Sequence, residues 1–138
     1  MTVAISSNRL VSLNAFKLGI VLGKGAFGKV RLVEHKATGI KYALKYVNKK
    51  RCIDSKSTTN IFRERILLQD LAHPLIINLK YAFQDDTNLY FVIDYAQGGD
   101  LRFYLDMHHR VDDDTLRVYA AELCCAIEYL HSNMIVHR

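Results

Sequence analysis

The sequence LGKGAFGKV, residues 22–30, guides the interpretation of the first half of this chain, because it places Gly23, Gly25 and Gly28 in a G-x-G-x-x-G pattern. Alone the pattern is weak evidence, since a glycine-rich turn without a ligand has the same composition. A dinucleotide-binding loop of this pattern needs a helix directly after its last glycine. Here β-branched, strand-like residues follow Gly28, and we expect no helix for about 30 residues. The sequence therefore favours a hairpin loop whose backbone N–H groups can face phosphate oxygens.

Strand-like segments continue on both sides of this loop. The pattern predicts strands at residues 16–23, 29–35 and 41–47, which would form an antiparallel meander. The turn KATG separates the last two strands, and its Gly39 is free to adopt a positive φ.

For the second half of the chain, the sequence pattern predicts one helix, two strands and two more helices. Residues 58–71 predict a helix, with Ile61, Arg65 and Leu68 on one stripe, and Pro74 prevents its continuation. Strands are expected at residues 75–83 and 89–95, around the polar turn QDDTN.

Gly98 and Gly99 then break the chain before the two remaining helices. Asp100 can cap a short helix that runs to Met107, and residues 112–132 predict a long helix with acids at its N-terminus. The last residues, NMIVHR, read as a short strand entering a loop. We therefore expect an α+β fold with a five-stranded antiparallel sheet, one helix between the third and fourth strands, and two helices after the sheet.

The long helix is expected to be apolar nearly all round. Leu116, Tyr119, Leu123, Ile127 and Leu130 form one stripe, and Val118, Ala121, Cys125 and Tyr129 cover much of the rest. A helix of this kind is normally buried, with other parts of a protein packed against every side of it. We therefore expect residues 1–138 to fold poorly by themselves.

Composition limits the class of protein. The 138 residues fit one ordinary domain or a piece of a larger one, and half of them are hydrophobic. There is no apolar run of transmembrane length. We expect neither a secretory leader nor myristoylation, because the first residues lack the pattern of a leader and no glycine follows Met1. Cys52, Cys124 and Cys125 have neither metal-binding nor redox spacing. We expect reduced thiols in an intracellular, cytoplasmic protein.

Charge is distributed unevenly along the chain. Residues 17–56 contain eleven Lys and Arg against two acids, a net charge of +9, whereas residues 57–138 contain seven against twelve, a net of −5. This asymmetry suggests an anionic ligand near the first part, although a solvated basic face is the simpler alternative. The basic residues are not interleaved with aromatic residues, so we do not expect nucleic-acid binding.

The motifs, taken in order, resemble the eukaryotic protein kinase family. GKGAFGKV is similar to its phosphate-covering loop, YALK to the strand motif that ends in the ATP-binding lysine, and FRERILLQ to the helix of its ion-pair glutamate. LYFVIDYAQGGDL looks like the strand entering the hinge, and the final HR matches the start of the His-Arg-Asp motif. QDDTNLYFVIDYAQGGDL and YAAELCCAIEYLHS resemble the AGC group of serine/threonine kinases, and LKYVNKKRC and GGDLRFYL look most like its YANK branch.

The resemblance implies a domain arrangement. Residues 1–15 would be an N-terminal extension, and residues 16–138 would be a partial kinase domain. Within it, residues 16–96 would form the N-terminal lobe and residues 97–138 the start of the C-terminal lobe.

It also implies an ATP site. Lys45 would hold the α- and β-phosphates, and Glu64 would position Lys45 through an ion pair. The alternatives are a lysine that extends into solvent and a glutamate on a solvated helix face. Val30 and Ala43 would enclose the adenine ring or, alternatively, simply pack within the sheet.

The remaining contacts would come from the hinge. Ile93 would be the gatekeeper, the backbones of Asp94 and Ala96 would bond adenine, and Asp100 would accept from the ribose unless it is a plain helix cap. The full set implied at the ATP site is Leu22, Gly23, Lys24, Gly25, Ala26, Phe27, Gly28, Lys29, Val30, Ala43, Lys45, Ile93, Asp94, Ala96 and Asp100.

Two further roles follow from the resemblance. Leu68, Leu79 and His137 would stack as three of the four residues of the regulatory spine, with ordinary core packing as the alternative. Arg138 would receive the phosphate of an activation loop.

The resemblance implies transfer of the ATP γ-phosphoryl group to protein hydroxyls, with Mg²⁺. The sequence stops one residue before the expected catalytic aspartate, and the family's metal ligands would lie further on, so we expect no metal site here. The acids at residues 112–114 cannot substitute, because they begin a helix away from the phosphates. We expect an inactive fragment, from a partial gene model or a truncated transcript. The alternatives are a nucleotide-binding or decoy module that ends at Arg138 and a dinucleotide-binding oxidoreductase.

Overall fold

A computed structural model describes residues 11–25, 28–55 and 58–137. Most of the expected N-terminal extension lies outside the described residues. So do Ala26 and Phe27 of the glycine loop, and Arg138.

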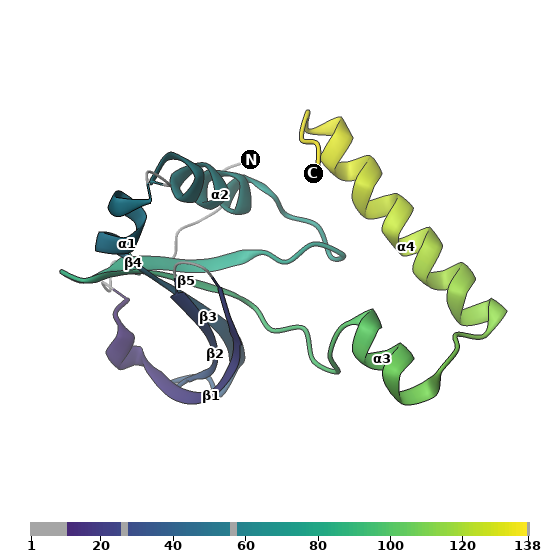
Figure 1. Ribbon diagram of the computed structural model, residues 1–138, viewed down its shortest axis with the longest axis horizontal. Coiled ribbons are helices and arrows are strands. Elements are labelled where there is room, and N and C mark those ends of the chain that lie inside the picture. The colour runs from purple at the N-terminus through teal and green to yellow at the C-terminus, as the bar shows by residue number, and fades with distance from the viewer. Residues whose placement is uncertain (1–10, 26–27, 56–57, 138) are drawn as a thin grey trace.

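The centre of the fold is one antiparallel sheet of five strands (Figure 1). Their order across the sheet is β1-β2-β3-β5-β4. The strands are β1 (Phe16–Lys24), β2 (Gly28–His35), β3 (Lys41–Asn48), β4 (Leu79–Gln84) and β5 (Asn88–Asp94). This confirms the predicted five-stranded sheet. Because Gly28 begins a strand and not a helix, the dinucleotide-binding alternative is wrong.

The two faces of the sheet bury separate cores. On one face, Phe16, Val33, Leu44, Tyr90 and Val92 form a buried cluster. The short 3₁₀ helix at Leu13–Ala15 packs against this cluster through Leu13 and Ala15. These two side chains cover part of an aromatic face whose other rings remain partly exposed.

On the other face, a second cluster joins the sheet to two helices. Val47 and Phe91 come from the sheet, Cys52 from helix α1 (Lys49–Asp54), and Ile61 from helix α2 (Thr58–Asp70). Ile61 is the buried residue of α2, whereas Arg65 of the same expected stripe is exposed. This cluster places α2 beside the centre of the sheet.

Helix α1 is a correction to the sequence-based expectation of a single helix between the third and fourth strands. Its N-terminus is capped by the Asn48 side chain, which accepts a hydrogen bond from the Arg51 N–H at 3.1 Å. Cys52 is 1% exposed. One buried residue in six leaves no periodic apolar pattern, so the sequence alone does not reveal this helix.

Strand β4 begins at Leu79, four residues later than expected. The Asn78 side chain donates to the carbonyls of His73 and Ile76, at 3.3 and 2.7 Å. These bonds fold the apolar residues Leu75–Ile77 into a turn before the strand begins. An apolar run alone does not distinguish such a turn from a strand.

Helices α3 (Leu101–His108) and α4 (Asp113–Ser132) follow the sheet as expected. Gly98 and Gly99 have φ values of 103° and 88°, which explains the break that they make between β5 and α3. The side chains of Asp100 and Asp112 cap the two helices by accepting from the Phe103 and Thr115 N–H groups.

Residues 133–137 do not form the expected short strand. The Asn133 N–H donates to the carbonyl of Tyr129 and the Ile135 N–H to that of Leu130, so the backbone closes the C-terminus of α4. Met134 takes a positive φ of 59° within this closure. A strand also needs a neighbour to pair with, and α4 offers none.

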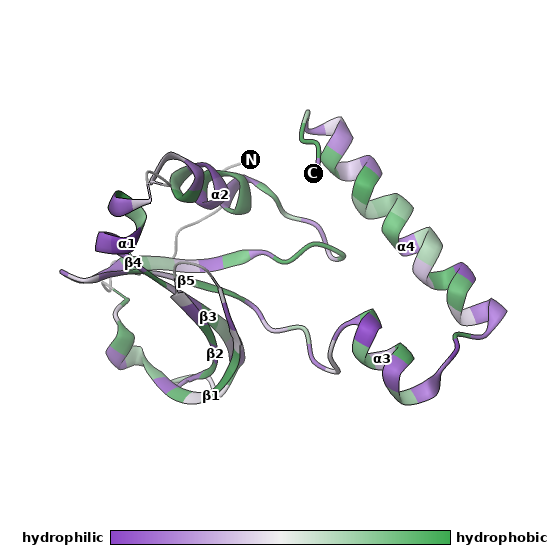
Figure 2. Cartoon of the chain, in the orientation of Figure 1, coloured by the Kyte–Doolittle hydropathy of each residue, from purple (hydrophilic) through white to green (hydrophobic). Residues whose placement is uncertain are grey.

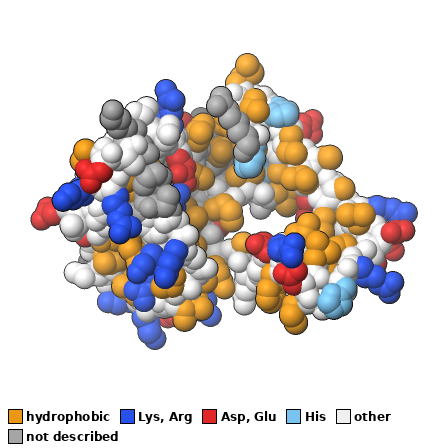
Figure 3. Space-filling view, viewed as in Figure 1, with side chains coloured by type: hydrophobic (Ala, Val, Ile, Leu, Met, Phe, Trp, Pro, Cys, Tyr) orange, Lys and Arg blue, Asp and Glu red, His pale blue; other side chains and the backbone are white. Residues whose placement is uncertain are grey.

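Helix α4 has no buried residue. Figure 2 shows hydrophobic residues along much of its length, and Figure 3 shows them on its surface. Leu116, Val118 and Leu123 are more than half exposed. No helix in the described part of the chain is both long and apolar enough to cross a bilayer.

Candidate nucleotide-binding site

An ion pair joins the sheet to α2 at the candidate site. Lys45 lies in the middle of β3, and its Nζ is 2.5 Å from Oε1 of Glu64, which lies on α2. Their side chains remain 34% and 47% exposed. The predicted pair is therefore present, in place of a lysine that extends freely into solvent, and it remains accessible to a ligand.

Strand register brings the expected adenine residues to the same face as Lys45. Val30 lies opposite Lys45, and Ala43 lies opposite Ile93. Directly opposed residues of antiparallel strands project to one face, and residues two apart on a strand do the same. Val30, Ala43, Lys45 and Ile93 therefore share the face that α2 covers.

The glycines of the loop differ in their surroundings. A Cβ at Gly28 would lie 1.7 Å from the Tyr46 carbonyl oxygen, so the close approach of β3 requires a glycine there. A Cβ at Gly23 or Gly25 would meet no atom within 4 Å. Neither of these two residues has a positive φ. The described fold itself therefore gives no reason for a glycine at either position.

The structure also places three other residues expected at the ATP site. Leu22 is 40% exposed on β1, and its contact with ATP stays a prediction. Lys24 lies opposite Lys29, and Lys29 lies opposite Tyr46, the neighbour of Lys45 in β3. Because neighbours on a strand point to opposite faces, the side chains of Lys24 and Lys29 lie on the face away from Lys45. They can serve the expected site only through their backbone.

Asp94, at the expected hinge, carries a polar network that sequence reasoning missed. Its Oδ2 accepts from the backbone N–H and the side-chain amide of Asn78, each at 3.0 Å, and its Oδ1 is 3.0 Å from Lys80 Nζ. Burial raises the pKa of the Asp94 carboxyl, but the bonds from Asn78 and Lys80 outweigh burial and leave that pKa below its ordinary value. The network ties the start of β4 to the end of β5, where adenine is expected to bind.

The other expected hinge residues lie on the segment after β5. Ala96 is exposed. Asp100 caps α3, with its Oδ1 accepting from the Phe103 N–H at 2.8 Å, so the cap interpretation holds. Its contact with a ribose stays a prediction.

The expected spine residues occupy different surroundings. Leu79 is half-buried and packs against the cluster of Val47, Cys52, Ile61 and Phe91. Leu68 is half-buried, and His137 is exposed. Their alignment into one stack stays a prediction.

The described residues contain no group of three His, Cys, Asp or Glu side chains close enough to hold a metal ion. On the face of Lys45, the carboxylate of Glu64 is already paired with the lysine.

Comparison with known proteins identifies the family. A model of the protein kinase domain matches residues 16–138. Serine/threonine-protein kinase 32C of Mus musculus is 41% identical over 128 residues, which is 93% of this chain and 26% of that protein. Serine/threonine-protein kinase 32B of Homo sapiens is 40% identical over 131 residues, 95% of this chain and 32% of that protein.

A relative of another type matches the full chain. RAC-beta serine/threonine-protein kinase of Rattus norvegicus is 45% identical over 139 aligned positions, 100% of this chain and 29% of that protein. The chain thus spans about a quarter to a third of the length of these curated relatives. Kinases 32B and 32C are of the YANK type, and similarity to them and to the RAC kinase places the chain among the AGC-like serine/threonine kinases. The family match, the sheet and the motifs agree that the chain belongs to the protein kinase family.

Proposed function

We propose that residues 16–138 are the ATP-binding part of a serine/threonine protein kinase, which transfers the γ-phosphoryl group of ATP to protein hydroxyls. The observation that carries this proposal is the accessible Lys45–Glu64 ion pair, on the same sheet face as Val30, Ala43 and Ile93. Membership of the protein kinase family supports it.

The glycine loop fits a phosphate ligand. Gly23 and Gly25 have open space where a side chain would stand, and no backbone strain requires a glycine. A ligand that approaches the backbone closely gives these positions a reason to lack a Cβ. Backbone N–H groups of such a loop can then donate to phosphate oxygens.

The side chains of this face have distinct tasks. The ammonium of Lys45 attracts the α- and β-phosphates, and Glu64 holds that ammonium in place, so the charge is positioned before the ligand arrives. Val30 and Ala43 offer apolar surfaces to the adenine ring, and the backbones of Asp94 and Ala96 bond its edge. The network of Asp94 with Asn78 and Lys80 fixes this part of the backbone.

The proposal includes a limit on activity. The family's catalytic base is the aspartate of its His-Arg-Asp motif, and residues 1–138 do not include it. Mg²⁺ neutralises the developing charge in this reaction, and the asparagine and aspartate that hold it in this family are not among residues 1–138. We therefore expect a polypeptide of residues 1–138 to contact ATP without transferring phosphate.

The first test measures ATP binding by calorimetry. Lys45→Met should weaken binding by about tenfold or more, because it removes the charge that meets the phosphates. Lys36→Met is the matched control, since Lys36 is an exposed lysine in the β2–β3 turn, and it should leave binding unchanged. Equal affinities of the two variants would contradict the ATP site.

The second test concerns phosphate transfer. The chain of residues 1–138 is incubated with labelled ATP and a basic protein substrate, beside a protein extended through a complete kinase domain. The extended protein should label the substrate, and the shorter chain should not. Turnover by the shorter chain that depends on Lys45 would overturn the proposed limit.

A further inference from the structure

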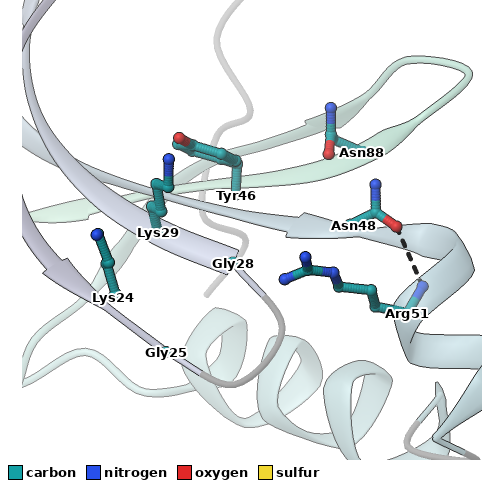
Figure 4. Close-up of a pocket in the computed structure, with 8 residues that line it drawn as sticks. All are labelled: Lys24, Gly25, Gly28, Lys29, Tyr46, Asn48, Arg51 and Asn88. Carbon is teal, nitrogen blue, oxygen red and sulfur yellow. Dashed lines mark hydrogen bonds between the residues drawn. The ribbon is translucent and has the colours of Figure 1, made fainter.

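A pocket lies at the end of the sheet nearest the glycine loop (Figure 4). Its volume is about 270 Å³. The side chains that line it belong to Lys24, Lys29, Tyr46, Asn48, Arg51 and Asn88. These residues come from β1, β2, β3, α1 and β5, so the pocket forms only when the sheet and α1 are assembled.

This pocket shares the glycine loop with the proposed ATP site but lies on the other face of the sheet. Lys29 lies opposite Tyr46, and Asn48 lies opposite Asn88, whereas Lys45 lies opposite Val30 and Phe91. Alternation along β3 puts Tyr46 and Asn48 on one face of the sheet and Lys45 on the other. A ligand in the pocket would therefore lie behind the glycine loop, across the sheet from Lys45.

The lining carries three cations and no carboxylate. Lys24, Lys29 and Arg51 all contribute, and the ion pairs of the described residues involve none of them. Gathering three positive charges without a counter-ion costs electrostatic free energy, which a bound anion would relieve. The positive charge of the lining is therefore available to a ligand.

Asp85, whose carboxylate accepts from the N–H of the lining residue Asn88, is bonded within its own turn. Asp85 Oδ1 accepts from the N–H groups of Thr87 and Asn88, at 2.8 and 2.7 Å, and Oδ2 accepts from the Tyr90 hydroxyl at 2.7 Å. Its side-chain oxygens are therefore engaged by donors of its own turn and form no ion pair with the lining cations.

Neutral donors complete the lining. Asn48 uses its Oδ1 to accept from the Arg51 N–H, so the amide hydrogens on its Nδ2 can face a ligand. In Figure 4 the Arg51 side chain extends toward Gly28, while Lys24 and Lys29 project from neighbouring strands. A guanidinium, two ammonium groups and an amide around one space suit the several oxygens of a tetrahedral anion.

We propose that this pocket binds a phosphate dianion, either as inorganic phosphate or as a phosphorylated side chain. The charge density of the dianion suits three cations, and its oxygens accept from the guanidinium and the amide at once. The side chains of Lys24 and Lys29 would thus bind the anion on the face of the sheet opposite Lys45. The site does not require ATP to occupy the other face.

The test is an NMR titration of the chain with inorganic phosphate, with chloride holding the ionic strength constant. Arg51→Gln should weaken phosphate binding by about tenfold, because it removes a charge-assisted donor pair. Lys50→Gln is the matched control on the same helix, outside the pocket lining, and should change the affinity less than about twofold. Equal losses in both variants would show only the general charge of a basic face and would overturn the site.

Two further variants keep this result interpretable. Lys29→Gln should weaken phosphate binding in the same direction as Arg51→Gln, and dispersed amide signals will show that each variant is folded. Lys45→Met should leave phosphate binding within about twofold, because Lys45 lies across the sheet. Loss of phosphate binding in Lys45→Met would place the anion at the ATP site and overturn the proposal.

A second titration distinguishes the two sources of the dianion. A short phosphoserine peptide is compared with its unphosphorylated form and with inorganic phosphate. Tighter binding of the phosphopeptide than of inorganic phosphate would identify a phosphorylated side chain as the ligand, and equal binding would identify free phosphate. Equal binding of the phosphorylated and unphosphorylated peptides would overturn the proposal.

Discussion

Gly28 and its two neighbours in the loop lack side chains for different reasons. At Gly28 the Tyr46 carbonyl occupies the position of a Cβ, whereas Gly23 and Gly25 face open space. Gly28 is therefore required for folding, and Gly23 and Gly25 are free to serve a ligand. The G-x-G-x-x-G spacing alone cannot separate these roles, because the difference arises from strand pairing.

Alanine substitutions should separate the two kinds of glycine. Gly28→Ala should lower the free energy of unfolding by about 1–3 kcal/mol, because β2 and β3 must move apart. Gly25→Ala should change it by less than about 0.5 kcal/mol and should instead weaken ATP binding. Urea unfolding and calorimetry measure the two effects. Equal destabilisation by both substitutions would contradict this distinction.

The Lys45–Glu64 pair should contribute to ligand binding more than to stability. Both side chains are partly exposed, so water screens their attraction. Glu64→Gln should lower the free energy of unfolding by less than about 1 kcal/mol, yet weaken ATP binding by releasing the lysine. Glu122→Gln on α4 removes an exposed carboxylate elsewhere and should alter neither quantity. Unchanged ATP affinity in Glu64→Gln would argue against a positioning role.

The turn between β4 and β5 depends on one ionised carboxylate. The Tyr90 hydroxyl and the N–H groups of Asn88 and Thr87 donate to Asp85 and lower its pKa from 3.8 to about 2. Because the folded pKa lies below the unfolded value, Asp85 stabilises the fold above about pH 4, and this contribution is lost as the pH falls toward 2.

Substitution of Asp85 should therefore show a pH-dependent effect. Asp85→Asn should have a lower urea midpoint than the parent chain at pH 7, and the difference should shrink between pH 4 and pH 2. Asp86→Asn removes a carboxylate from the same turn and should follow the parent profile. A difference that stays constant with pH would mean that the charge of Asp85 is unimportant.

Elements with a clear period are the ones that sequence predicts well. The alternation around Val30 and Ala43 and the capped helices after Asp100 and Asp112 matched the structure, because each follows from local residues. Helix α1, the turn before Leu79 and the closure after Ser132 did not. Each depends on a side-chain or backbone hydrogen bond that periodicity does not record.

The candidate site divides in the same way. Lys45 and Glu64 were predictable because each lies in a short motif, YALK and FRERILLQ, that resembles a kinase motif. Their contact is confirmed. The binding of Asp94 by Asn78 and Lys80, and the projection of Lys24 and Lys29 away from Lys45, follow from strand register. Strand register is set by pairing between distant segments, so the local sequence pattern does not predict which side chains share a face or a contact.

Helix α4 exposes several large apolar side chains, and a charge placed among them should improve solubility. Leu123 is 61% exposed. Leu123→Glu should change the free energy of unfolding by less than about 0.5 kcal/mol, because little burial is lost, while reducing self-association. Gel filtration and binding of a hydrophobic dye measure the association.

The control for this prediction makes the same change of net charge elsewhere on the helix. Arg117→Gln alters an exposed, charged position and should leave self-association unchanged. If Leu123→Glu unfolds the chain instead, Leu123 must pack against a partner even in the isolated protein.

Tyr129 couples the two halves of the chain. Its hydroxyl accepts from the Ala72 N–H at 3.0 Å, and its ring lies 4.8 Å from that of His73, just before β4. The chain between Asp94 and Leu101 joins β5 to α3, and the Tyr129 contact is a second link, between α4 and the segment before β4. None of the strand pairings involves Tyr129, so loss of this contact is expected to loosen α4 against the sheet without altering the sheet itself.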